Sequence, residues 1–145
     1  MLKKIPVTEI CSSLLIFLFA YTAISKLTGY KKFHWVLSES PLIHNGAGII
    51  VWLLPAAELL IVLLLIIPQH RRIGLHASLV SLVLFTSYLL YMIVTTPHLP
   101  CSCGGVISSL SWKQHVLFNL FFIGVSISGL IATKHPHLKM LRNQE

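Results

Sequence analysis

The sequence predicts an all-α fold: a polytopic membrane four-helix bundle with both termini in the cytoplasm. Two observations support the fold class, a strongly apolar composition and four apolar runs of membrane-spanning length. A third observation, the uneven distribution of Lys and Arg between the segments that connect the runs, supports the orientation.

The composition excludes a soluble enzyme and a disordered chain. Hydrophobic residues make up 55% of the 145 residues and charged residues only 10%, whereas soluble domains carry about 25% charged residues. The mean hydropathy is +0.82. So few charges cannot cover a soluble surface, and disorder requires low hydrophobicity with high charge. The net charge of +7 does not indicate nucleic-acid binding, because no basic cluster alternates with stacking aromatic residues.

Four apolar runs of about 20 residues match the thickness of a bilayer core. They cover about residues 9–28, 47–67, 73–95 and 114–133, and they predict a single membrane domain over residues 1–145. Only helices satisfy their own backbone hydrogen bonds in lipid, so each run should be a helix. Pro55 lies inside the second run and predicts a kink there.

The basic residues predict the orientation. Seven Lys and Arg residues lie in the N-terminal segment, the second connection and the C-terminal tail, against four in or beside the first and third connections. Because segments rich in Lys and Arg stay in the cytoplasm, both termini should be cytoplasmic and the third connection, residues 96–113, should face outward. We therefore expect a multi-pass membrane protein, with membrane lipid around it and no nucleic-acid partner.

The third connection contains the strongest functional signal. Cys101 and Cys103 are two residues apart, with Pro100 before them and Gly104 and Gly105 after them. The proline and the glycines favour a bend that lets the two thiols form a small disulfide ring, and the glycines leave room for another protein's backbone. Thiol–disulfide exchange requires that access, because it proceeds through a mixed disulfide. An outward loop would also place the pair in an oxidising compartment.

Two other interpretations of the cysteine pair stay open. The pair could be inert, although so small a ring constrains the unfolded chain very little. It could also hold a metal together with His98 and His115, but this spacing matches no zinc signature, so no metal site is predicted. Cys11 lies toward the other side of the membrane, and we expect it to be a small buried hydrophobic residue.

The fourth run carries a stripe of small and polar residues that should face the other helices. Phe122 completes this stripe, whose other members are His115, Asn119, Ser126, Gly129 and Thr133. The third run shows a weaker stripe at Ser81, Tyr88 and Thr95. His115 lies at the outer end, near the cysteine loop, where an imidazole could assist thiolate formation or simply begin the helix.

Glu58 lies in the middle of the second run, roughly 13–16 Å from either end at about 1.5 Å per residue. An ionisable side chain at that depth is costly and indicates function by default. Lys26, near the outer end of the first run, and His76, near the inner end of the third, are both candidate partners. Glu58 and Lys26 therefore form either a structural polar contact or a proton or quinone site. No other cofactor is evident from the sequence.

These features together resemble the MauE branch of the DoxX-like membrane proteins, over about residues 10–132. The segment Cys101-Ser102-Cys103-Gly104-Gly105 is the most specific part of the resemblance. Its other parts are Ser25-Lys26-Leu27, Ser40-Pro41-Leu42, Pro55, Glu58, Ser111-Trp112, His115 and Asn119. The resemblance implies four membrane helices and a redox-associated role outside the membrane. The founding member acts, with a thioredoxin-like periplasmic partner, in maturing the disulfide-rich small subunit of methylamine dehydrogenase.

The four-helix layout is also similar to the vitamin K epoxide reductase family. That family couples a Cys-x-x-Cys pair to a second pair in a loop, and this chain has no second external pair, so a self-contained relay to quinone is disfavoured. The sequence and the resemblance together favour a small thiol–disulfide factor of the bacterial inner membrane, working with a thioredoxin-like exported protein or a cysteine-rich client. The alternative is a non-enzymatic membrane anchor or assembly scaffold. A small transporter is less favoured, because no inverted repeat is visible.

The predicted orientation can be tested by thiol labelling in intact cells. After mild reduction, a maleimide that cannot cross membranes should label Cys103 from outside, because the third connection is predicted to face outward. A Cys11→Ser background removes the only other cysteine outside the pair. Labelling that appears only after permeabilisation would show the opposite orientation and remove the oxidising environment on which the redox interpretation depends.

Overall fold

The computed structural model describes residues 7–95 and 112–142, with side chains described over residues 7–95 and 113–133. Four long helices are joined in the order α1 (Val7–Thr28), α3 (Ala47–Ile66), α4 (Arg71–Thr95) and α5 (Trp112–Arg142). A short helix α2 (Tyr30–Ser38) and a 3-10 turn (His44–Gly46) lie between α1 and α3. The described residues contain no strand, so the all-α prediction is confirmed.

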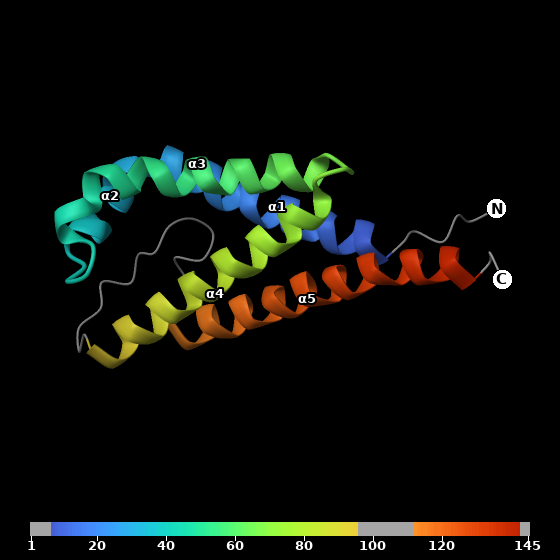
Figure 1. Cartoon of the computed structure of the whole chain (residues 1–145). Helices are drawn as coiled ribbons and strands as arrows, with labels where there is room; N and C mark the ends of the chain where they lie inside the picture. The colour runs from blue at the N-terminus through green and yellow to red at the C-terminus, as the bar shows by residue number, and fades with distance from the viewer. Residues whose placement is uncertain (1–6, 96–111, 143–145) are drawn as a thin grey trace.

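The four long helices form two pairs, α1 beside α3 and α4 beside α5, and α1 also packs against α5 (Figure 1). All four are long and apolar enough to cross a membrane. The beginning of α1, the end of α5 and the α3–α4 connection lie at one end of the bundle, and α2 lies at the other (Figure 1). The side of the membrane on which each end lies remains a prediction.

The lipid-facing surface is apolar, as a membrane protein requires. Large hydrophobic side chains point outward from each pair of helices, including Phe17 (74% exposed), Ile49 (73%) and Val94 (84%). An apolar outer surface of this extent would cause aggregation in water but is compatible with a lipid environment.

The connection between the first two spans contains a helix, α2, that the sequence did not predict. This helix has nine residues, which is too short for the membrane-length patterns on which the prediction relied. It begins after Gly29, where an added Cβ would lie 3.1 Å from the carbonyl oxygen of Ser25. Its buried side chains are Phe33, Val36 and Leu37, and its first residue, Tyr30, packs against Trp52 of α3 with the ring centroids 5.1 Å apart.

Helix α5 also extends further than predicted, to Arg142 rather than residue 133. Its apolar part, Lys113–Thr133, closely matches the predicted run. The difference arises because hydropathy detects only the part of a helix suited to lipid, whereas the helix continues into the polar tail.

Two glycines allow the helices to approach closely at the end that holds the α3–α4 connection. A Cβ added at Gly74 of α4 would lie 2.9 Å from the backbone nitrogen of Leu65 in α3. A Cβ added at Gly129 of α5 would lie 3.0 Å from Leu75 Cδ2 and 3.2 Å from Cys11 Cβ. These contacts join all four long helices, in agreement with the use of small residues at helix interfaces in membranes. Cys11 is buried here, as expected.

The close contact at Gly129 predicts a position-specific effect on stability. Gly129→Leu should lower the free energy of unfolding by about 1–3 kcal/mol, because the larger side chain overpacks the contact with α1 and α4. Gly124→Leu on the same helix should cost little, since an added Cβ there meets nothing within 4 Å. Thermal unfolding of both variants in detergent gives the comparison, and equal midpoints would contradict the proposed packing.

Candidate functional site

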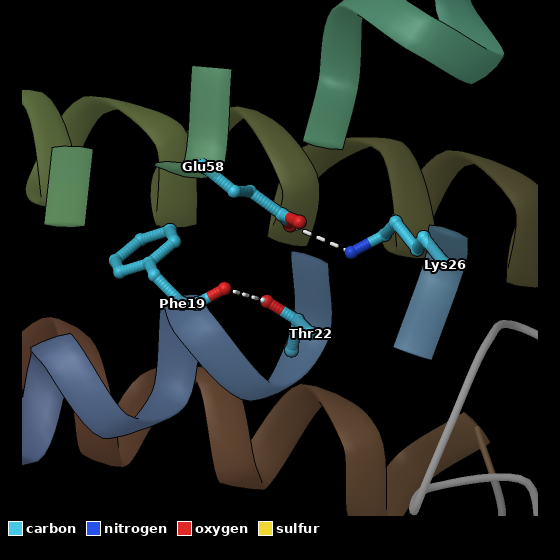
Figure 2. Close-up of polar contacts among 4 residues, drawn as sticks. All are labelled: Phe19, Thr22, Lys26 and Glu58. Atoms are coloured by element: carbon cyan, nitrogen blue, oxygen red, sulfur yellow. Dashed lines mark hydrogen bonds and ion pairs between the residues drawn. The ribbon is translucent and has the colours of Figure 1, made fainter. Parts of the chain in front are cut away.

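A buried ion pair joins the first and second membrane spans. Lys26 Nζ lies 2.6 Å from Glu58 Oε1 (Figure 2). Both side chains are about nine-tenths buried, with 11% and 10% of their surface exposed. Lys26 lies in the last turn of α1 and Glu58 in the second half of α3, so two long side chains extend along the bundle to meet.

The structure therefore chooses between the two candidate partners of Glu58. His76 is exposed, and its Nδ1 lies 2.8 Å from the carbonyl oxygen of Arg72 on its own helix. Lys26 is held further by Phe33 of α2, whose ring centroid lies 6.0 Å from Nζ. Pairing two opposite charges makes the site neutral overall, which reduces the cost of placing them inside a membrane protein.

One oxygen of Glu58 is left without a partner. Thr22, which lies close to Glu58, instead donates its hydroxyl to the carbonyl of Phe19 at 3.1 Å (Figure 2). Within the part of the chain that the structure describes, Glu58 Oε2 accepts no hydrogen bond, and Asn119 Nδ2 on α5 donates none. Buried polar atoms without partners are uncommon in folded proteins, so both indicate a site that is completed by something else.

The ion pair lies in the wall of an internal cavity of about 310 Å³. Every helix contributes to the wall, which is mainly apolar and includes aromatic rings from α1, α2, α4 and α5. Its principal polar side chains are Lys26, Glu58, Ser81, Tyr88, His115 and Asn119. Apolar cavities of this size with a few polar groups are the usual form of small-molecule sites.

The polar stripe predicted on the fourth span faces the bundle interior. His115, Asn119, Phe122 and Ser126 are all buried, and the ring of His115 packs against Phe85 with the centroids 5.7 Å apart. The weaker stripe on the third span is only partly correct, because Ser81 and Tyr88 line the cavity but Thr95 is exposed. Thr95 is the last residue of α4, and its hydroxyl donates to the carbonyl of Tyr91 on its own helix.

Ser40 was noted in the sequence only as part of a short motif, and its contacts were not anticipated. The hydroxyl of Tyr88 donates to Ser40 Oγ at 2.8 Å, and Ser40 is 1% exposed. The carbonyl of Ser40 also accepts hydrogen bonds from the backbone N–H groups of Ile43 and His44. This serine thus fastens the connection between α2 and α3 to α4. The sequence signal that could have indicated these contacts was the position of Ser40 next to Pro41, between two apolar segments.

The predicted redox residues lie outside the described residues. This applies to Cys101, Cys103, Pro100, Gly104 and Gly105, and to His98 of the alternative metal site. Among the described residues no group of three or more His, Cys, Asp or Glu side chains could hold a metal ion. His115 is the one residue of the predicted redox set whose position is described, and it lines the cavity.

The burial of the Lys26–Glu58 pair predicts an unequal response to single and double substitution. Lys26→Met or Glu58→Leu alone should destabilise the protein by about 3–5 kcal/mol, because each leaves one buried charge unpaired. The double variant should recover most of that loss, since no charge remains, and Glu58→Gln should lose less than Glu58→Leu because its oxygen still accepts a hydrogen bond.

Unfolding in detergent, monitored by circular dichroism, measures these four variants against the parent protein. If the losses in free energy of unfolding from the two single variants simply add up in the double variant, the two side chains do not interact.

Comparison with known proteins assigns the family. The family model described as methylamine utilisation protein MauE matches residues 4–132 of the 145. No curated protein and no solved structure gives a significant match. The match includes all four apolar spans, the Lys26–Glu58 pair and the cysteine segment. The chain therefore belongs to the MauE family of membrane proteins.

Proposed function

We propose that this MauE-family protein performs or supports thiol–disulfide exchange on the periplasmic side of the bacterial inner membrane. Cys101 and Cys103 carry the exchange, and the partner is a thioredoxin-like exported protein or a cysteine-rich client. The observation that carries the proposal is the Cys-x-Cys-Gly-Gly segment in the connection between the last two spans of a MauE-family chain. The family match supports the membrane location, and the segment supports the chemistry.

The exchange between the cysteine pair and its partner needs no cofactor. The thiolate of one cysteine attacks a disulfide of the partner, so that a mixed disulfide forms and a partner thiolate leaves and takes up a proton. The second cysteine then attacks the first, which closes the Cys101–Cys103 disulfide and releases the partner as a dithiol. The same steps in reverse oxidise the partner. Either cysteine can begin the exchange, and we expect Cys103 to be the less hindered because Gly104 and Gly105 follow it in the sequence.

His115 is assigned an auxiliary role. It lies in the first turn of the described part of α5, twelve positions after Cys103. Its side chain is 7% exposed and lines the internal cavity. An imidazole there can accept a thiol proton only if a cysteine approaches the cavity, so its contribution to thiolate formation depends on that approach.

Removal of one cysteine should trap the partner. In a Cys11→Ser background, Cys101→Ser or Cys103→Ser should each give a covalent adduct on a non-reducing gel that disappears with reductant, because the resolving thiol is missing. The double serine variant should give none. Mass spectrometry of the adduct should identify an exported thioredoxin-like protein or a cysteine-rich client. His115→Ala should slow adduct formation more at neutral than at alkaline pH, where the thiolate forms without help.

The opposite results would support the non-enzymatic alternative. If neither single variant traps a protein in the native host and the double serine variant works normally, the exchange proposal is wrong and the protein is an anchor or scaffold. Zinc or copper that co-purifies with the parent protein and is lost in each single variant would assign the cysteines to a metal site.

A further inference from the structure

The internal cavity has the features of a ligand site, and none of them involves the cysteine pair. Two residues of its wall, Glu58 and Asn119, are 7% and 4% exposed, and each carries a buried polar atom that has no hydrogen-bond partner among the described residues. The atom on Glu58 is a carboxyl oxygen that accepts a hydrogen bond, and the atom on Asn119 is an amide nitrogen that donates one. A hydroxyl group offers both of the missing partners, because it donates through its hydrogen and accepts through its oxygen.

The rest of the wall indicates what carries that hydroxyl. Phe19, Phe33, Phe85 and Phe118 line the cavity together with aliphatic side chains. Such walls favour a flat apolar ring, which can stack or pack edge-on against the phenyl groups. The Lys26–Glu58 pair already balances its own charge, so a neutral ligand fits better than an ion, whose transfer into the membrane interior would be costly.

The cavity also reaches the lipid-facing surface. Leu84 of α4 belongs to its wall and is nevertheless 66% exposed. Helices α3 and α4 approach closely at Gly74 and separate toward the α2 end (Figure 1), which is the end where the cavity lies. This exposed wall residue favours entry of a lipid-soluble molecule from the membrane side of the bundle.

We infer that this cavity binds a lipid-soluble phenol, of the chemical class of a membrane quinol. The hydroxyl pairs with Glu58 and Asn119, and the ring occupies the aromatic part of the cavity. A quinone of the same skeleton binds more weakly, because its carbonyl oxygens only accept hydrogen bonds and leave Glu58 Oε2 unpaired.

The test uses the full chain with both Cys101 and Cys103 replaced by serine, so that the result is independent of thiol chemistry. Isothermal titration calorimetry in detergent measures binding of 2-methyl-1,4-naphthoquinol, the matching quinone, and decanol as an aliphatic alcohol. We expect saturable binding of one quinol per chain, with the quinone at least about tenfold weaker. Size-exclusion chromatography and thermal unfolding establish that each variant is folded.

A matched pair of substitutions on α4 locates the site. Ser81→Phe fills the cavity and should abolish quinol binding, whereas Ser87→Phe, at an exposed position on the same helix, should leave it unchanged. Asn119→Leu should weaken quinol binding about tenfold through loss of one hydrogen bond.

Three results would overturn the inference: no saturable quinol binding, equal binding to the Ser81→Phe variant, or equal affinity for decanol. The last would identify a site for an aliphatic chain. All three are distinct from the results of the disulfide-trapping experiment.

Discussion

The Lys26–Glu58 ion pair is the interaction on which the functional end of the bundle depends. An isolated charge at either position would be too costly inside a membrane, but the pair is neutral and each residue makes the other tolerable. It links α1 to α3 across the interior, and Phe33 of α2 packs beside it. The cavity is built around this contact. Polar side chains of α4 and α5 complete the same space, so one buried pair brings together residues that are far apart in the sequence.

The two ends of the bundle are built on different principles. At the end of the α3–α4 connection, Gly74 and Gly129 let backbones approach and leave little free space. At the other end, large aromatic side chains and α2 hold the helices apart, and a cavity of about 310 Å³ remains. Close packing in a membrane protein depends on small residues, because lipid offers no hydrophobic driving force between helices. The distribution of glycine and aromatic residues thus determines where the interior is dense and where it is open.

The sequence was sufficient to predict the membrane-spanning helices, because the lipid bilayer constrains their length and composition. Apolar length identified the four spans, and the spacing of His115, Asn119 and Ser126 identified the inward face of the last one. The partner of Glu58 could not be predicted, because rise per residue gives only a vertical gap and says nothing of the lateral distance between helices. Helix α2 was missed because nine residues are too few for a membrane-length pattern. The cavity depends on how the five helices diverge in space. The spacing of residues within one helix does not predict that arrangement.

The tight contact at Gly74 has a mechanical consequence for the interior. Because α4 touches the backbone of α3 at this point, the two helices cannot slide apart there without losing the contact. Any change in the separation of the α3 and α4 walls of the cavity must therefore come mainly from a change in the angle between these two helices about this contact. Ser40 and Tyr88 lie far from this contact and join the connection before α3 to the C-terminal half of α4. A small rotation at the glycine would be amplified at that hydrogen bond, which limits how far the open end can widen.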